Sequence, residues 1–204
     1  MALHVRPATA ADHADSLLYE SARPYYDAYA GREERARRLL AAVWSERAHA
    51  ASWEVCAVAE EDGEVVGVLA GYPVAEADRM ARRFLRLTMR RMPAWRWPAV
   101  IVHLHAAQGL APAPPPRAFY VDALAVAAGH RRRGVARRLL AEAERRSRAA
   151  GLEGVALDTG IDNAPARALY EAAGYRLEAE RRTRSKRLAR AVGGRGFAAY
   201  VKPT

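Results

Sequence analysis

The sequence predicts a mixed α/β fold, in which one sheet carries helices on both of its faces. Short apolar segments rich in β-branched and aromatic residues alternate with longer segments whose apolar residues recur every three to four positions. With 204 residues, of which 51% are hydrophobic and 27% charged, the chain can bury a substantial core. Because no internal repeat and no long linker divides it, we expect residues 1–204 to form one domain.

The N-terminal part of the sequence predicts a strand, two helices and a hairpin. Pro7 stops the first strand, and the Thr9–Asp12 pattern is typical of a helix start. We expect strands at residues 3–6, 53–59 and 64–72, with a hairpin turn at 60–63. We expect helices at residues 9–20 and 33–50, and a loop or short turn at 22–31.

Residues 75–117 form a helical insert that ends in prolines. Its first part, residues 79–91, is a basic amphipathic helix with Met80, Phe84 and Leu87 on one side. An apolar run at 99–104 and an extended proline-rich connector at 111–116 follow. Three roles stay open for the insert: packing on the core, contact with a membrane surface through its tryptophans and arginines, or lining a substrate pocket.

The second half of the chain returns to alternating strands and helices. We expect a buried strand at 119–126, followed by a tight basic turn and a helix from residue 134 to Gly151. Later strands are expected at residues 154–158, 175–180 and 197–201. A short helix is expected at residues 163–173 and a basic loop at residues 183–195.

The turn between strand 119–126 and the following helix is a predicted anion site. Unpaired backbone N–H groups at a helix N-terminus point at an approaching anion. Gly134 and the small Ala136 let a phosphate come close to the backbone. Arg131, Arg132 and Arg133 add positive charge at the same place, so the residues alone predict a bound phosphate or pyrophosphate.

Two motifs in this half resemble a known family. The pattern Val126-x-x-x-x-Arg131-x-x-Gly134-x-Ala136 resembles the acyl-CoA-binding signature of the GNAT superfamily of N-acetyltransferases. The run from Asp162 to Tyr175 resembles the second motif of that family. Ala128 departs from the pattern, because many members carry proline there. The resemblance implies a mostly antiparallel, twisted sheet of six to seven strands with helices on both faces.

The resemblance also implies a cofactor, acetyl-CoA, and a set of residues that hold it. Backbone amides from Arg131 through Ala136 would bind the pyrophosphate, and the strand at Leu124, Ala125 and Val126 would pair with the pantetheine arm. An N–H near Val126 would stabilise the oxyanion. The implied cofactor-binding residues are Leu124, Ala125, Val126, Arg131, Arg132, Arg133, Gly134, Val135, Ala136, Arg137, Asn163, Arg167 and Tyr170.

The implied reaction is direct attack of a primary amine, from a small molecule or a peptide, on the acetyl thioester. Tyr170 would protonate the departing thiolate as general acid. Asp122, which we expect on the same strand face as Leu124 and Val126, would act as base or hold the amine. Tyr25, Tyr26 and Tyr29 fall where family members line the acceptor site. A non-catalytic sensor of acyl-CoA remains the alternative function.

Composition sets further expectations about partners and compartment. The net charge of +10 favours an anionic ligand, yet no recognition helix accompanies it, so we expect no nucleic acid. The single cysteine, Cys56, excludes an internal disulfide, and His103 and His105 alone are too few for a metal site. With neither a signal peptide nor a membrane span in view, the expected location is the cytoplasm without stable membrane insertion. A homodimer stays open.

Overall fold

A computed structural model describes residues 3–204 and confirms the expected mixed α/β fold. The strands are β1 (His4–Pro7), β2 (Cys56–Glu61), β3 (Glu64–Pro73), β4 (Ala118–Val126), β5 (Gly154–Gly160), β6 (Arg176–Arg182) and β7 (Gly196–Pro203). The helices are α1 (Asp15–Ser21), α2 (Arg23–Ala30), α3 (Glu33–Trp44), α4 (Val74–Arg90), α5 (Trp97–Leu110), α6 (Val135–Ala149), α7 (Ala164–Ala172) and α8 (Lys186–Val192).

The strands form one seven-stranded sheet in the order β1-β2-β3-β4-β5-β7-β6. Every neighbouring pair is antiparallel except β4 and β5, which run parallel in the middle of the sheet. The α6 helix is the crossover between these two parallel strands, as such a connection requires. This mostly antiparallel arrangement is the one that the sequence resemblance implied.

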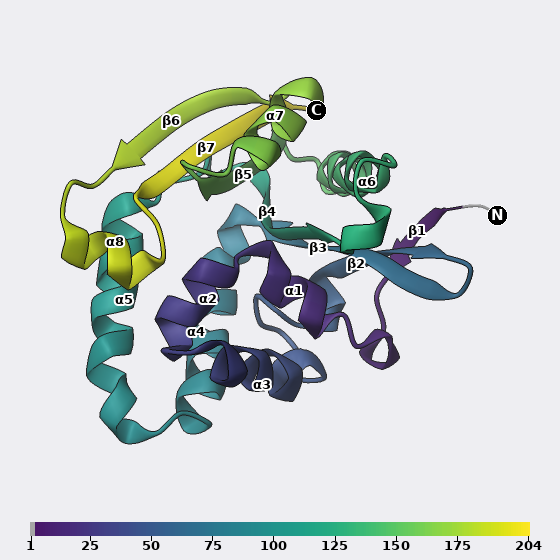
Figure 1. The fold of residues 1–204 in the computed structure, drawn as a ribbon. Helices are drawn as coiled ribbons and strands as arrows, with labels where there is room; N and C mark the ends of the chain where they lie inside the picture. The colour runs from purple at the N-terminus through teal and green to yellow at the C-terminus, as the bar shows by residue number, and fades with distance from the viewer. Residues whose placement is uncertain (1–2) are drawn as a thin grey trace.

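Helices cover both faces of the sheet, with α6 and α7 on one side and α1 to α4 on the other (Figure 1). The core on the α6 side is built around Leu139, Leu157 and Tyr200, all fully buried. The core on the other side surrounds Leu18 and Trp44, which are equally inaccessible to solvent. These two apolar layers hold the central strands between them, and the site described below lies on those strands.

Two segments expected as loops are short helices. Residues 22–31 contain α2, which has Pro24 in its first turn and ends at Gly31 in the left-handed conformation. Residues 183–195 contain α8, where the Ser185 side chain accepts from Leu188 N–H and Gly193 is the left-handed C-cap. The prediction of loops was therefore wrong at both places.

Two expected element bounds also differ from the structure. The helix expected over residues 33–50 ends at Trp44, and a 3₁₀ turn, Trp53–Val55, precedes β2.

The insert consists of α4 and α5, and α5 packs against α2 and α8 (Figure 1). Met80 and Leu87 bury the apolar side of α4 in the core. On α5, His103 is buried, with Nδ1 at 2.6 Å from the carbonyl of Ala191 and its ring centroid 4.4 Å from that of Tyr25. None of the helices within residues 3–204 is long and apolar enough to cross a membrane.

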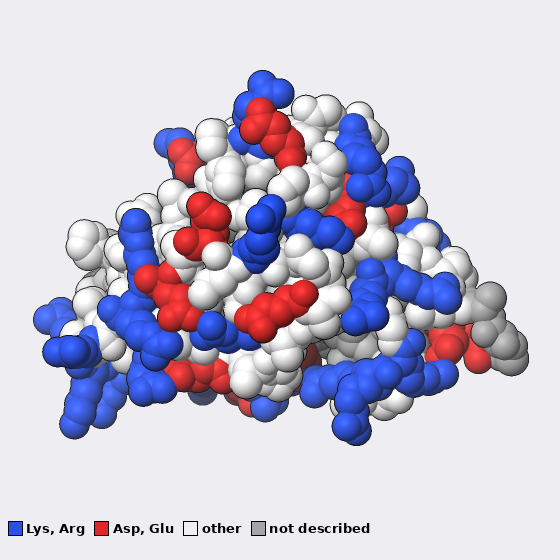
Figure 2. All heavy atoms as spheres, turned by 90° about the horizontal axis from the view of Figure 1, so that it is seen from above, with Lys and Arg blue, Asp and Glu red and all other residues white. Residues whose placement is uncertain are grey.

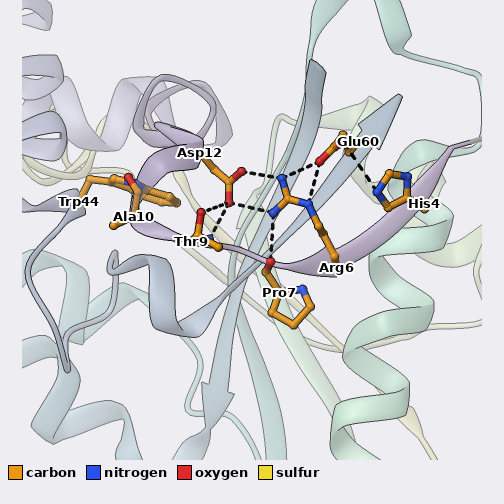
Figure 3. Close-up of polar contacts among 8 residues, drawn as sticks. All are labelled: His4, Arg6, Pro7, Thr9, Ala10, Asp12, Trp44 and Glu60. Atoms are coloured by element: carbon orange, nitrogen blue, oxygen red, sulfur yellow. Dashed lines mark hydrogen bonds and ion pairs between the residues drawn. The ribbon is translucent and has the colours of Figure 1, made fainter. Parts of the chain in front are cut away.

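An arginine on the first strand ties the N-terminal segment to the sheet (Figure 3). The Arg6 guanidinium donates to Asp12 at 2.6 and 2.9 Å and to Glu60 of β2 at 2.7 Å. The same contacts hold the pKa of Asp12 down, at about 2, because a nearby cation favours the ionised carboxylate. Nearby, Trp44 of α3 donates its indole N–H to the carbonyl of Ala10 at 3.0 Å. The edge strand β1 is thus fixed by side chains as well as by its ladder with β2.

Candidate active site

The central feature of the site is the divergence of the two parallel strands. β4 and β5 pair only from Ala118–Gly154 to Val121–Leu157, although β4 continues to Val126 and β5 to Gly160. Beyond that point β4 pairs with β3 on one side alone. The opposite edge of its backbone is consequently open, and an extended ligand can take the place of a strand there.

The backbone groups on this open edge can be assigned from the ladder. Ala127 donates its N–H to Val66 of β3, and backbone groups alternate between the two sides along a strand. The N–H groups of Leu124 and Val126 are therefore directed to the side that β5 has left. The Val126 carbonyl already accepts from Arg131 Nε at 3.1 Å. Two N–H donors thus remain for a ligand along this edge.

The turn that follows β4 presents a row of further free donors. The backbone N–H groups of residues 132–137 find no acceptor within residues 3–204. Arg132 and Gly134 take the left-handed conformation, with φ of 60° and 85°, which turns successive N–H groups toward one point. A Cβ built on Gly134 meets no atom within 4 Å. This concavity of donors at the start of α6 fits a diphosphate such as that of coenzyme A.

The arginines near the turn differ in how strongly other protein groups bind their guanidinium groups. Arg133 forms an ion pair with Glu61 at 3.1 Å, and Arg137 donates to the carbonyl of Ala172 at 3.3 Å, both at exposed positions. Arg167 is more firmly engaged, since it donates to Tyr200 at 3.0 Å and pairs with Glu180 at 2.7 Å. Exposed partners exchange readily with water. Arg133 and Arg137 are therefore better placed than Arg167 to turn to a phosphate.

Asn163 caps α7. Its side-chain oxygen accepts from Ala166 N–H at 3.3 Å, and its amide donates to Thr159 at 3.0 Å. The cap positions α7, and with it Tyr170, beside the end of β5. Asn163 thus has a structural task in addition to any contact with the cofactor arm.

Tyr170 lies on the buried side of α7. Its ring packs against Tyr175 and Tyr200, with centroid distances of 6.3 and 5.6 Å. Burial, together with the nearby charge of Asp158, raises the pKa of Tyr170 above its usual value. The Tyr170 hydroxyl forms no hydrogen bond within residues 3–204, whereas the hydroxyl of the neighbouring Tyr200 contacts Arg167 and Glu171. Because its pKa is raised, the Tyr170 hydroxyl is protonated at neutral pH. Its proton is not donated to any of the described residues.

Asp122 occupies a β-bulge, and its position differs from the expected one. The ladder with β3 pairs Ala70 with Ala123 and Gly71 with Val121, so Asp122 is the extra residue. It faces Tyr72 and the α2 side, whereas Leu124 and Val126 pack toward α6. The three side chains do not share one face, because a bulge shifts the alternation by one residue.

The environment of Asp122 makes its carboxylate unusually basic. The side chain is exposed to solvent, yet many protein atoms lie around it. Desolvation raises the pKa of Asp122 to about 6, the Tyr72 hydroxyl opposes this, and the charge of Asp158 adds to it. A carboxylate with this pKa is ionised at neutral pH and can accept a proton.

The three tyrosines of α2 separate into two kinds. Tyr25 and Tyr26 lie close enough to Asp122 that its charge, after desolvation, raises their pKa values. Tyr29 is buried, and its hydroxyl hydrogen-bonds the Thr88 hydroxyl of α4 at 2.5 Å. Tyr25 and Tyr26 therefore lie near Asp122, and Tyr29 joins α2 to the insert.

Sequence reasoning missed three residues near Asp122, namely Tyr72, Tyr120 and Asp158. Tyr120 on β4 donates its hydroxyl to Asp158 of β5 at 2.6 Å, and its ring lies 6.2 Å from that of Tyr72. The signal available in the sequence was an aspartate at the end of an otherwise apolar strand, at residues 154–158. Its meaning depends on the pairing of β4 with β5, which brings residues 120 and 158 together.

The two histidines of the insert do not form a pair. His103 is buried beside Tyr25, whereas His105, two positions along α5, is exposed. No cluster of three or more metal-ligating side chains occurs within the described part of the chain.

Comparisons with known proteins agree with this geometry. Residues 16–175 match the acetyltransferase (GNAT) family. No protein of curated function matches the sequence. A solved structure of an acetyltransferase superposes with a TM-score of 0.67 at 21% identity, covering 98% of each chain. An N-acetyltransferase from Staphylococcus aureus Mu50 gives 0.67 at 14% identity, with coverage of 98% of this chain and 100% of that one.

A third solved structure, an agmatine N-acetyltransferase variant in its apo form, gives a TM-score of 0.61 at 18% identity and covers 99% of both chains. At such identities these likenesses establish the fold, and the family match covers most of the sequence, including the divergent strands and the donor-rich turn. This chain belongs to the GNAT family of acetyltransferases.

Proposed function

We propose that the protein transfers the acetyl group of acetyl-CoA to a primary amine of a small molecule or peptide, by direct attack of the amine. The observation that carries this proposal is the continuity of free donors along one edge. The N–H groups of Leu124 and Val126 on β4 are followed, after a short turn, by those of residues 132–137 at the start of α6. A thioester arm and its diphosphate need such a row, and GNAT proteins bind acetyl-CoA.

In this reaction we assign one task each to Asp122, to an N–H group of β4 and to Tyr170. When bound, acetyl-CoA supplies an activated acetyl thioester. Asp122 accepts the proton of the amine, directly or through water, so that the neutral nitrogen can form the C–N bond. An N–H on the open edge of β4 stabilises the negative charge on the carbonyl oxygen. Tyr170 donates its proton to the sulfur as the C–S bond breaks.

The test is release of free thiol from acetyl-CoA across a panel of aliphatic, aromatic and peptide amines. We expect thiol release that depends on the amine and yields an N-acetylated product by mass spectrometry. Tight binding of acetyl-CoA with no turnover on any amine would instead indicate a sensor without catalysis.

A substitution at Gly134 tests the cofactor site by itself. Gly134→Glu places a carboxylate where the diphosphate is expected, and like charges in contact cost several kcal/mol, so the affinity for coenzyme A should fall by ~100-fold or more. Gly134→Ala is the matched control. It suffers the same strain at a φ of 85°, yet its methyl group meets no atom within 4 Å. Equal coenzyme A affinity of folded Glu and Ala variants, measured by calorimetry, would overturn the assignment.

A further inference from the structure

The exposed apolar side chains of the described residues gather on the insert. Of the five large hydrophobic side chains that are exposed, four form one apolar patch, namely Trp95, Trp97, Ile101 and Val102. Trp95 is 71% exposed and Ile101 64%. The fifth, Leu177, lies on β6. Single exposed hydrophobic residues are ordinary on a protein surface, whereas a group such as the apolar patch indicates an interaction site.

The helix α5, which carries most of the apolar patch, lacks the charged side that a surface helix normally has. No aspartate, glutamate, lysine or arginine occurs from Trp97 to Leu110. The inner side of α5 packs on α2 and α8 and includes the buried His103. Its outer side includes Trp97 and Ile101, which are four positions apart and therefore neighbours on one face. That outer side is an apolar surface without a cover among the described residues.

Contacts with α2 and α3 hold the tryptophans of the apolar patch in place. Arg96, which lies between them in the sequence, is half-buried and donates to the carbonyls of Ala28 at 2.5 Å and Tyr29 at 3.3 Å. The guanidinium carbon of Arg35, on α3, lies 5.3 Å from the centre of the Trp95 ring. The segment is thus fixed to the helices behind it, although both indole rings are exposed to solvent. A surface that is preformed in this way loses little entropy when it binds a partner.

Arginines dominate the insert, and carboxylates are few. From residue 79 to residue 121 the chain contains eight arginines and no aspartate or glutamate, so this stretch supplies +8 of the net charge of +10. Arg86 and Arg90, in the last part of α4, are exposed and form no ion pair within residues 3–204. A partner that complements this surface therefore carries negative charge.

A hollow of about 490 Å³ continues the patch and is lined mainly by arginines. They are Arg32, Arg35, Arg38 and Arg91. Within residues 3–204 this set pairs with two carboxylates, Glu34 and Glu46. Arg35, which contacts Trp95, pairs with neither of them and donates to the carbonyl of Ala30. The hollow thus has a net positive charge and fits a phosphate group, because a guanidinium can bind two phosphate oxygens at once.

We propose that the apolar patch and the arginine-lined hollow bind the anionic surface of a lipid bilayer, with the tryptophans at the depth of the lipid headgroups. Indole rings favour that depth, because one part of the boundary is apolar and the other wet. Arginines beside them are attracted to the lipid phosphates. A second copy of this chain complements the surface less well, since in a two-fold dimer the same surface meets itself and arginines face arginines.

The position of the insert leaves the cofactor site accessible in this complex. α5 and the segment before it lie on the left side of the molecule in Figure 1, and α6 lies on the right. A bilayer that covers the outer side of α5 therefore leaves the donor-rich turn at the start of α6 in water. The inference does not depend on acetyl transfer, because lipid binding uses none of the residues assigned to that reaction.

Flotation with lipid vesicles tests this proposal. We expect the wild type to float with vesicles of phosphatidylcholine and phosphatidylglycerol in a ratio of about 2:1, and not with phosphatidylcholine alone. Ile101→Ser should weaken binding to the mixed vesicles by about tenfold, because it removes an apolar side chain from the contact. Leu177→Ser is the matched control on β6 and should bind as the wild type does. Absence of flotation of the wild type, or equal losses in the two variants, would overturn the inference.

A pair of double variants separates this surface from attraction by net charge alone. Arg35→Gln with Arg38→Gln removes two arginines of the hollow, three positions apart on α3. Arg145→Gln with Arg148→Gln removes two exposed arginines with the same spacing on α6. Each pair has one arginine bound to a glutamate, and both double variants have the same net charge. We expect binding to the mixed vesicles to weaken by roughly 30-fold in the first and by less than about threefold in the second. Equal losses would show unspecific attraction and refute the surface.

Sedimentation of the wild type without vesicles tests the remaining occupant, a second copy of the chain. We expect a monomer at micromolar concentration. A dimer that Ile101→Ser dissociates would assign the apolar patch to self-association and refute lipid binding. Flotation needs neither acetyl-CoA nor an amine, so a failure of acetyl transfer and a failure of lipid binding are observed separately.

Discussion

The proposed role of Tyr170 as proton donor depends on its hydroxyl group alone. Replacing it with phenylalanine removes the hydroxyl and keeps the ring between Tyr175 and Tyr200. We expect kcat to fall by ~10- to 100-fold, because a thiolate needs only modest help from an acid. Acetyl-CoA affinity and the melting temperature should stay close to those of the wild type. An unchanged kcat in single-turnover measurements would exclude Tyr170 as the proton donor.

At pH values where Asp122 is ionised, this residue should lower the free energy of unfolding. Its folded pKa, about 6, lies above the ordinary value of 3.8, so the folded state prefers the protonated form. The wild type therefore loses stability from this group as the pH rises from about 4 through about 6. Asp122→Asn should melt at a higher temperature than the wild type above about pH 6 and lose this advantage near pH 4. Melting curves that differ equally at all pH values would contradict the shifted pKa.

The site residues that could be predicted are those whose partners are close in sequence. The donor turn at 131–136 follows directly from Gly134 at the end of a strand and the start of a helix. The contact between Tyr120 and Asp158 could not be predicted, because it depends on two strands meeting across 38 positions. The bulge at Asp122 has no signal in the apolar alternation of β4, so the prediction that Asp122 shares a face with Leu124 and Val126 was wrong.

The helix α8 packs on α2, which carries Tyr25 and Tyr26. A Cβ on Gly193 would overlap the backbone of Pro24 and Tyr25, and its φ of 73° disfavours other residues. Gly193→Ala should push the helices apart and move Tyr25, at a cost of ~2–3 kcal/mol from backbone strain and overlap. The melting temperature should drop by ~5–10 °C, and the KM for the amine should rise more than the KM for acetyl-CoA.

Gly194→Ala is the control for this variant, because a Cβ there meets no atom within 4 Å. The two substitutions are neighbours and chemically identical, so a difference between them reports the helix contact together with the strain at the φ of 73° of Gly193. Similar KM values for the amine in both variants would show that α8 does not position Tyr25.

The elements themselves were predictable to different degrees. Long amphipathic segments such as α6, and apolar strands such as β3, follow from periodicity alone. The helices α2 and α8 were missed because each is short and contributes few buried side chains, although each has recognisable capping residues. Their helical state depends on packing against α5, which lies about 80 residues from each of them in sequence.

At the scale of the whole molecule, the charge of +10 acts on the two substrates in opposite ways. Basic and acidic side chains intermingle on the face that carries α6 and α7 (Figure 2). The long-range field is nonetheless positive, so it should attract the polyanion acetyl-CoA and repel a cationic amine. The nearby carboxylates Asp122 and Asp158 must overcome that repulsion at short range.

Ionic strength should therefore change kcat/KM for the two substrates in different ways. Raising salt from about 20 to about 200 mM shortens the Debye length to ~7 Å and screens the long-range field more than contacts at short range. We expect kcat/KM for acetyl-CoA to fall several-fold, while kcat/KM for the amine stays constant or rises. Parallel decreases for both substrates would mean that carboxylates elsewhere on the surface, and not Asp122 and Asp158, attract the amine. The measurement uses potassium chloride at fixed pH. If kcat/KM falls for acetyl-CoA and rises for the amine, carboxylates bind the amine at short range although the protein carries a net charge of +10.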